Sequence, residues 1–378
     1  MGGALTGAAR TPRILAASSP GEVRVAAVDG DGALVDYAIW RPGAPDGVGD
    51  LHRGRLTARM PALAGCFVLL DGADGFLPDS EGGRDATEGT VLGVRVTRAA
   101  QGGKGLRLTA RLTATEQGKI GGGAPALLAR GPGAVERLAA LHPGAEILMD
   151  DGSLAASLRA RLGDRMTMRA QVLDDALADA IDALGTPEVA LPGGGRLLIQ
   201  PTAALVAIDL DSGAASASRQ GKAAAQLGFN RAALPVLARQ IRLRSLSGAI
   251  LVDFAGLAAR RRPALAPELA AALAQDPGGA RLLGFTALGL AEIVRPRTHP
   301  PLHELLAGPH AAGLAALRQA ARDVDARPVR VAALRASPAI VAALQVDPVA
   351  LPDLARRIGR SLMLRSDPAL PRDAWVLE

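Results

Sequence analysis

The segment from residue 195 to 297 constrains the fold most, because short apolar runs alternate in it with helical runs. Strands are predicted in RLLIQ, ALVAIDLD and GAILVDF, and helices in FNRAALPVLARQIRLRSL and APELAAALAQDP. The last part, ARLLGFTALGLAEIVRP, predicts one strand or two. Strands and helices that alternate in this way predict an α/β layer.

Two of these predicted strands end in aspartate. Asp209 and Asp211 lie two positions apart in LVAIDLDSG, so both project from one face of the strand. Asp253 ends the strand in SGAILVDF. If the two strands are neighbours, Asp209 and Asp253 emerge together at their C-terminal ends, where sites form in open α/β sheets.

Neighbouring carboxylates repel each other unless a cation lies between them. A hard divalent ion with oxygen ligands relieves this repulsion, and Mg²⁺ is the usual choice. Aspartates that follow strands also cap helices or begin turns, so a purely structural role fits the same spacing.

Basic residues end the predicted helix between the two acidic strands. Arg239, Arg242 and Arg244 are candidate contacts to the phosphates of a nucleic acid, since an arginine fork suits phosphate. The alternative is that the helix dipole favours basic side chains at this end. The net charge of +6 favours a polyanionic partner, although a compositional bias toward arginine explains the same charge.

The N-terminal part predicts β-structure. Residues 13–47 alternate short apolar runs with turns, and residues 48–113 hold five further short strands that predict a small closed barrel. Phe67, Phe76 and Lys104 lie in this barrel. Aromatic rings on a barrel face stack on bases and a loop lysine contacts phosphate, whereas packing in the barrel core is the ordinary alternative.

Several classes of protein are excluded by composition. A single cysteine, Cys66, excludes an internal disulfide framework and a cysteine-rich zinc site. No run approaches the roughly 18 apolar residues that span a bilayer, and the N-terminus lacks a signal pattern. We expect a soluble, cytoplasmic protein. A nucleotide-handling α/β enzyme is a weaker alternative, because neither GGGAP nor LPGGGR has the flanks of a phosphate-binding loop.

Several segments together resemble one family, the ribonuclease E/G endoribonucleases. The strongest resemblance covers residues 193–297, where ARQIRLRSL precedes an Asp-Phe strand. VRVAAVDGDGALVDYAI and HRGRLTARMPALAGCFVLLDGADGFLP also resemble parts of the family, as do residues 318–378.

The resemblance implies an α/β fold of several subdomains. An RNase H-like subdomain with an inserted OB-fold RNA-binding barrel precedes a DNase I-like catalytic subdomain and a small C-terminal α/β domain. The implied bounds are 1–47 and 114–190 for the RNase H-like parts, 48–113 for the barrel, 191–306 for the catalytic subdomain, 307–317 for a linker and 318–378 for the last domain.

The resemblance also implies roles for the candidate residues. Asp209 and Asp253 fall on the family's ligands for catalytic Mg²⁺, for which Mn²⁺ is a possible substitute, and Asp211 replaces an asparagine that supports them. The barrel residues that grip single-stranded RNA correspond to Phe67, Phe76 and Lys104.

The sequence departs from the family at several points. Ala203 and Gly256 stand where the family has acidic residues, and AGPHAAG replaces the cysteine link near 307–312. We therefore expect no zinc and no zinc-linked dimer, although another oligomer stays open. The 5′-monophosphate sensor domain also has no counterpart, so cleavage stimulated by the 5′ end is not expected.

These features predict a Mg²⁺-dependent endoribonuclease that acts on single-stranded RNA in RNA processing and decay. It is expected to leave 5′-phosphate and 3′-hydroxyl ends. The alternative is an RNA-binding protein that keeps the scaffold with weakened or lost chemistry, since acidic residues are missing at Ala203 and Gly256.

Overall fold

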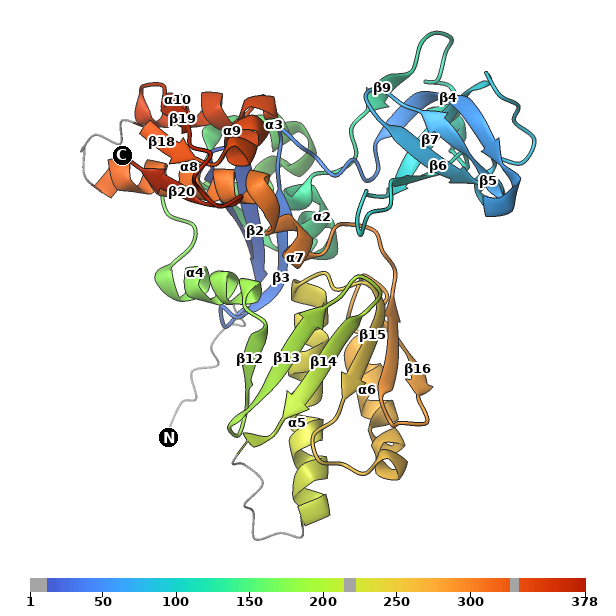
Figure 1. Cartoon of the computed structure of the whole chain (residues 1–378), viewed down its shortest axis with the longest axis vertical. Coiled ribbons are helices and arrows are strands. Elements are labelled where there is room, and N and C mark those ends of the chain that lie inside the picture. The colour runs from blue at the N-terminus through green and yellow to red at the C-terminus, as the bar shows by residue number, and fades with distance from the viewer. Residues whose placement is uncertain (1–11, 214–221, 327–332) are drawn as a thin grey trace, which may run out of the picture. The chain divides into compact units, whose positions relative to one another are not determined.

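The computed structural model describes residues 12–213, 222–326 and 333–378 (Figure 1). The chain forms two compact units. One unit comprises residues 45–133 and 297–301, and the other comprises the residues up to 44, 134–296 and 302–378.

The smaller unit is a closed β-barrel. Its sheet has the order β5-β6-β8-β7-β4-β9, and a further pairing of β4 with β5 closes five of these strands into a ring. The strands are β4 (Leu51–Met60), β5 (Gly65–Leu69), β6 (Asp74–Pro78), β7 (Val91–Arg98), β8 (Leu106–Thr109) and β9 (Ala126–Ala129). Alternate side chains such as Cys66 and Val68 fill the core.

The predicted barrel is confirmed as a closed β-barrel, but the unit extends beyond the expected bound of 113. Residues 114–133 were assigned to the RNase H-like part but belong to the barrel unit. Strand β9 lies in this segment and pairs with β4, after the short helix α1 (Ala114–Gln117). Arg53 holds the intervening glycine-rich loop through the carbonyls of Ile120 and Ala124.

The larger unit begins with a five-stranded sheet of order β11-β10-β1-β2-β3. Its strands are β1 (Arg13–Ser19), β2 (Glu22–Val28), β3 (Leu34–Trp40), β10 (Glu146–Met149) and β11 (Met166–Met168). Antiparallel pairing of β1, β2 and β3 gives the meander predicted for 13–47. Helices α2 (Ala134–Leu141) and α3 (Gly152–Leu162) pack on one face and α4 (Asp175–Asp182) on the other.

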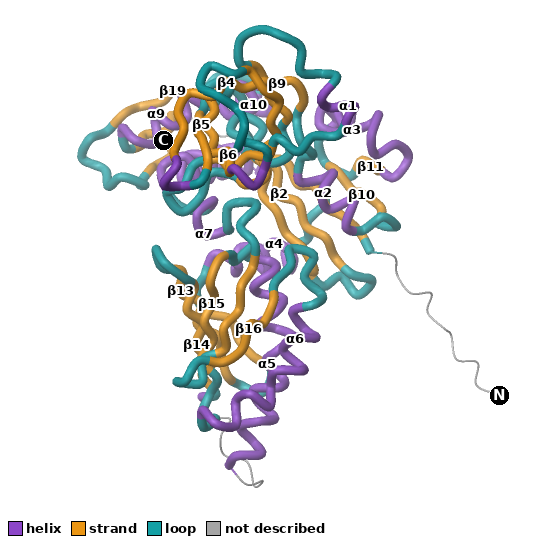
Figure 2. The backbone as a smooth tube through the Cα atoms, turned by 90° about the vertical axis from the view of Figure 1, so that its right-hand side faces the viewer, coloured by secondary structure: helices purple, strands orange, loops and turns teal. Residues whose placement is uncertain are grey.

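A second, six-stranded sheet has the order β12-β13-β14-β15-β17-β16. Its strands are β12 (Glu188–Leu191), β13 (Gly195–Pro201), β14 (Val206–Asp211), β15 (Gly248–Asp253), β16 (Arg281–Phe285) and β17 (Ala291–Arg295). Helices α5 (Lys222–Leu243) and α6 (Ala266–Leu273) lie along one side of this sheet (Figure 2). The side chains on the opposite face of this sheet are exposed or half-buried, because no described helix covers that face. This arrangement confirms the predicted α/β layer.

The C-terminal part is a small α/β layer. Strands β18 (Ala333–Ala336), β19 (Met363–Ser366) and β20 (Trp375–Leu377) form its sheet. Three helices pack on it: α8 (Gly308–Ala326), α9 (Pro338–Val346) and α10 (Ala350–Ile358). No described helix is by itself long and apolar enough to cross a membrane, and α9 with α10 meets that test only as a pair bent by 87°.

The linker expected at 307–317 is wrong, because α8 begins at residue 308 and follows the short helix α7 (Leu302–Leu305). Its glycines and proline suggested a break in structure. Proline is tolerated in the first turn of a helix. Gly313 lies where a Cβ would come within 2.8 Å of Leu344, so close helix packing explains that glycine.

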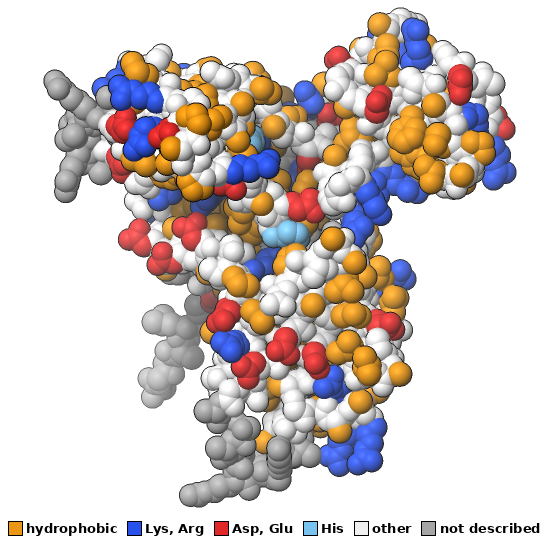
Figure 3. Space-filling model, in the orientation of Figure 1, with side chains coloured by type: hydrophobic (Ala, Val, Ile, Leu, Met, Phe, Trp, Pro, Cys, Tyr) orange, Lys and Arg blue, Asp and Glu red, His pale blue; other side chains and the backbone are white. Residues whose placement is uncertain are grey.

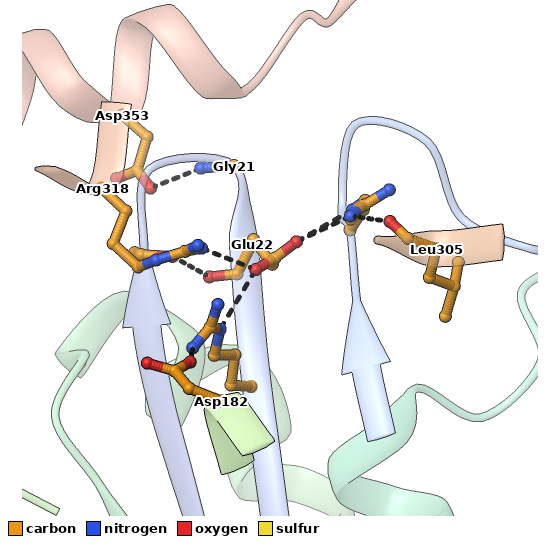
Figure 4. A network of polar contacts seen from close by, with 9 residues as sticks. Gly21, Glu22, Asp182, Leu305, Arg318 and Asp353 are labelled. Carbon is orange, nitrogen blue, oxygen red and sulfur yellow. Dashed lines mark hydrogen bonds and ion pairs between the residues drawn. The ribbon is translucent and has the colours of Figure 1, made fainter. Parts of the chain in front are cut away.

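A buried carboxylate joins the first sheet to the C-terminal elements (Figure 4). Glu22 is 3% exposed and accepts hydrogen bonds from three arginines. The distance from a carboxylate oxygen of Glu22 to the nearest guanidinium nitrogen is 2.9 Å for Arg41, 2.9 Å for Arg318 on α8 and 3.4 Å for Arg24. Arg41 also donates to the carbonyl of Leu305 at 2.6 Å, which ties α7 to the same network.

We predict that Glu22→Gln lowers the free energy of unfolding by about 3–5 kcal/mol, because it leaves buried cations without a counter-charge. Burial acts to raise the pKa of Glu22, but Arg41, Arg318 and Arg24 outweigh it and the pKa is lowered. The stabilisation is therefore present above the unfolded-state pKa and disappears as pH falls through the folded-state pKa.

Urea denaturation at neutral and acidic pH measures this effect. Glu268→Gln is the matched control, because its pair with Arg231 is about half exposed and is expected to contribute no more than about 1 kcal/mol. Equal losses for the two substitutions would contradict the prediction.

Candidate functional site

Parallel pairing of β14 with β15 places two carboxylates side by side. The register runs from Val206 opposite Ile250 to Asp209 opposite Asp253. Ile208 and Val252 precede the aspartates and are buried under the helices, so the aspartates project from the other face. We call Asp209 and Asp253 the acidic pair. Neighbouring strands lie about 4.8 Å apart, which brings the two carboxyl groups within reach of one ion.

Asp211 lies on the same exposed face, two residues beyond Asp209. Its Oδ2 accepts a hydrogen bond of 3.2 Å from Arg196 on the neighbouring strand β13, and its Oδ1 accepts one of 2.9 Å from the backbone of Gly213. Acidic side chains gather on this face of the sheet, with basic ones beside them (Figure 3). The predicted common face of Asp209 and Asp211 is therefore present.

Arg262 holds the other member of the acidic pair. Its guanidinium donates to Asp253 Oδ1 at 2.5 Å and to the carbonyls of Leu257 and Gly289 at 2.7 and 3.2 Å. Only 13% of the Arg262 side chain is exposed, so these contacts fix its position. Asp253 is thus oriented and partly neutralised by a cation of the chain itself.

Asn230 fastens the loop that follows β15 to helix α5. Its side chain is fully buried, donates to the carbonyls of Gln226 and Ala255, and accepts from the backbone N–H of Ala255. The next residue, Gly256, has a φ of +60°, and a Cβ there would lie 2.3 Å from the Gln226 amide. An acidic side chain at position 256 is therefore disfavoured by the backbone conformation, and it would also require the flexible Gln226 amide to move.

The charge of Asp209 is the least compensated of the three. Burial raises its pKa, Asp253 and Asp211 raise it further, and Arg196 opposes them. Among the described residues no cation forms an ion pair with Asp209, in contrast to Asp253 and Asp211. A cation bound between the two strands would relieve this repulsion.

The residues fit an open site for a divalent ion better than a closed cage. Within the described ranges no group of three or more His, Cys, Asp or Glu side chains has the geometry of a metal site. Mg²⁺ commonly takes only one or two carboxylates and fills its other positions with water and substrate phosphate. The acidic pair meets that requirement, with Asp211 beside it.

The arginines near the end of α5 are not brought to the acidic pair. Arg242 forms a bidentate ion pair with Asp36 on β3, and buried Arg244 donates to Thr186 at 2.5 Å and Gln240 at 2.8 Å. Arg239 is exposed. These residues lie where α5 leads into the start of β15, whereas Asp253 lies at the end of that strand. Their placement supports the structural alternative for Arg242 and Arg244.

The two phenylalanines of the barrel form a pair outside its core, with Phe67 exposed and Phe76 half-buried. Phe67 on β5 is opposite Phe76 on β6, with ring centroids 5.6 Å apart and an interplanar angle of 69°. Phe67 is 37% exposed and neither ring belongs to the buried barrel core. We call them the aromatic pair. Lys104 is exposed in the β7–β8 loop, where its backbone bonds to Gln101 at both N–H and carbonyl.

Three residues that shape the acidic site were missed in the sequence. Arg262 lies in a run of three arginines after the second acidic strand, Arg196 lies across from Asp211, and Asn230 lies in FNR. The arginine run was the available signal for Arg262. The other two depend on which strands and helices are neighbours, which the local pattern does not contain.

Opposite changes of pKa at Asp209 are predicted for two substitutions. Asp253→Asn removes a negative neighbour and is expected to lower the pKa, whereas Arg196→Gln removes a positive neighbour and is expected to raise it. Carbon-13 NMR titration of labelled aspartate carboxyls without divalent ions measures both. Asp31→Asn, in the exposed β2–β3 turn, is the control and leaves the pKa unchanged. Shifts of the same sign would refute the electrostatic account.

Comparison with known proteins gives one family. Residues 156–298 match the model of the ribonuclease E/G family. Ribonuclease E of Nostoc sp. (strain PCC 7120) is 38% identical over 120 residues, which cover 32% of this chain and 17% of that relative. Ribonuclease G of Escherichia coli (strain K12) is 34% identical over 120 residues, which cover 32% of this chain and 24% of that relative.

A longer similarity extends over most of the chain. Ribonuclease E of Escherichia coli (strain K12) is 26% identical over 399 positions, which cover 77% of this chain and 37% of that relative. Its 399 positions exceed the length of the chain, so the alignment contains gaps on the side of this chain. The chain spans well under half the length of each of these relatives.

Proposed function

Because the chain belongs to the ribonuclease E/G family, we propose that it is an endoribonuclease that cuts single-stranded RNA at the acidic pair. The observation that carries the proposal is the parallel register that sets Asp209 opposite Asp253 on an exposed sheet face. Two neighbouring carboxylates at the ends of these strands, of which only Asp253 forms an ion pair with a described cation, favour a divalent ion and, through it, a phosphate.

Each residue of the site has a distinct part in this proposal. Asp209 and Asp253 hold Mg²⁺, or Mn²⁺ in its place, and Arg262 keeps Asp253 in position. Asp211 is kept beside them by Arg196. When bound between Asp209 and Asp253, such an ion would supply charge to polarise a scissile phosphate and to lower the pKa of a water molecule, which would favour products with 5′-phosphate and 3′-hydroxyl ends.

The barrel supplies the grip on RNA in this proposal. The aromatic pair offers exposed rings for bases to stack on, and Lys104 offers a cation in the adjoining loop. Stacking tolerates any base and phosphate contacts carry no sequence information, so cleavage is expected to show slight sequence preference and strong salt dependence.

The short connection after the barrel supports the absence of a sensor domain. Only residues 130–133 separate β9 of the barrel from α2, so no further domain lies between these two elements. We therefore propose that a 5′-monophosphate does not stimulate cleavage. Residues 308–312 belong to α8 and contain no cysteine, so we propose no zinc link between subunits.

A second candidate is an RNA-binding protein without the chemistry. Arg262 and Arg196 already compensate two of the three carboxylates. Ala203 and Gly256 also lack the carboxylates that support the metal ligands in the family. Loss of such supporting groups typically weakens metal binding by about 10–100-fold.

Cleavage of a 5′-hydroxylated, A/U-rich single-stranded RNA in Mg²⁺ distinguishes the candidates. We expect Asp209→Asn and Asp253→Asn each to slow scission by about 100-fold or more, because several kcal/mol of charge stabilisation is lost. Gel electrophoresis of end-labelled RNA measures the rate, and Asp31→Asn is the matched control with full activity.

RNA binding without scission by the unsubstituted chain would favour the second candidate. Scission that survives Asp209→Asn would remove this residue from the mechanism. Retained binding by Asp209→Asn is expected, because the aromatic pair and Lys104 are unchanged.

Replacement of either ring is predicted to weaken binding rather than chemistry. Phe67→Ala and Phe76→Ala are each expected to reduce the affinity for single-stranded RNA by about 1–3 kcal/mol, the usual contribution of a stacked base. Fluorescence anisotropy with Asp209→Asn as the background measures binding without cleavage. Leu69→Ala, which removes an exposed aliphatic side chain from the same strand, should leave affinity nearly unchanged. An equal loss at Leu69 would contradict a stacking role.

A further inference from the structure

The aromatic pair belongs to a longer row of side chains across the outside of the barrel. Phe67 is opposite Phe76, Phe76 is opposite Arg107 on β8, and Arg107 is opposite Arg98 on β7. Registered partners on neighbouring strands share a face of the sheet. The adjacent Leu108 is fully buried, so Arg107 projects outward with the rings.

A third arginine is brought to the end of this row by the segment 297–301. The backbone N–H of Ala99 donates to the carbonyl of Thr298 at 2.9 Å, which docks this segment beside the end of β7. Arg297 therefore lies next to Arg98, and its charge acts on Arg98 together with that of Arg107. We call Arg98, Arg107 and Arg297 the arginine cluster.

The arginine cluster is not compensated by acidic side chains. None of its three members forms an ion pair with any residue that the structure describes, in contrast to Arg41, Arg242 and Arg295 of the larger unit. Arg98 donates from its Nη2 to the carbonyl of Gly105 at 3.1 Å, whereas its Nε is buried without a hydrogen-bond partner.

The close approach of the three arginines is unfavourable when no anion is bound to them. Burial lowers the pKa of Arg98, and the like charges of Arg107 and Arg297 lower it further. A buried donor without an acceptor adds to the cost. An anion with several oxygens lowers this cost, because it neutralises the repulsion among the three guanidinium groups.

We propose that the arginine cluster binds a backbone phosphate of the RNA strand whose base stacks on the aromatic pair. The inference rests on the proposed function, since it extends the same RNA-binding face. A ring and an arginine in successive positions of one row match a base and the phosphate next to it. The site is selective for a phosphodiester strand by charge and stacking, and indifferent to base identity.

Binding of a fluorescein-labelled single-stranded RNA of about ten nucleotides tests the proposal, a length within the range of one barrel site. The protein is the full chain carrying Asp209→Asn, without divalent ions, so cleavage does not enter the measurement. Anisotropy is recorded over a series of salt concentrations for Arg107→Gln, Arg98→Gln, Arg297→Gln and Arg107→Lys.

Each Arg→Gln variant is expected to bind RNA several-fold more weakly, and its plot of log K against log salt is expected to flatten by about 0.7. Arg107→Lys should keep the slope of the parent, because it keeps the charge. Arg130→Gln is the matched control: it removes the same charge from the same unit, but Asp50 already neutralises Arg130 at 2.7 Å. Circular dichroism melting checks that each variant is folded.

Unchanged affinity and slope in Arg98→Gln and Arg107→Gln would overturn the proposal, as would an equal change in Arg130→Gln. Absence of RNA binding by the parent would overturn it as well. If the arginine variants lose binding while the chain with native Asp209 fails to cut RNA in Mg²⁺, the inference stands and the proposed nuclease activity fails.

Discussion

Repulsion between the carboxylates of Asp209 and Asp253 is the constraint on which the candidate site depends. Parallel pairing of β14 with β15 fixes them opposite each other, and the chain compensates them unequally. Arg262 reaches Asp253 and Arg196 reaches Asp211, but no described cation pairs with Asp209. In the proposed function, the unbalanced charge at Asp209 attracts the divalent ion, and the two arginines limit how strongly it is held.

The buried face of the sheet enforces this geometry. Ile208, Leu210 and Val252 pack under α5 and α6, so a slip of one residue in either strand would turn an aspartate into the core and a large apolar side chain outward. Asn230 adds a second restraint where the strand ends, because it links the loop after Asp253 to α5. The site is therefore held by hydrophobic packing on one side and by directional hydrogen bonds at its edge.

The local sequence pattern predicted the features that depend on the alternation of apolar and polar residues. The common face of Asp209 and Asp211, the barrel strands and the helices of the α/β layer follow from alternation and turn residues. The arginines of α5 show the limit: a basic helix end fits an RNA contact or a helix dipole, and the outcome for Arg242 depends on Asp36, which is 206 residues away. The linker expected at 307–317 is a second case, because the packing of Gly313 against Leu344 is invisible in the local sequence.

The arginines of the two units differ in whether carboxylates neutralise their charge. In the larger unit, several arginines with little exposure form ion pairs with carboxylates: Arg41 pairs with Glu22, Arg242 with Asp36 and Arg295 with Asp276. In the barrel unit, the arginine cluster beside the aromatic pair meets none among the described residues. In the proposed function, the barrel therefore attracts an RNA phosphate by its own charges, whereas the acidic sheet face needs a bound cation to do so. The proposal thus assigns affinity for RNA and dependence on a divalent ion to different residues, so that each can change without the other.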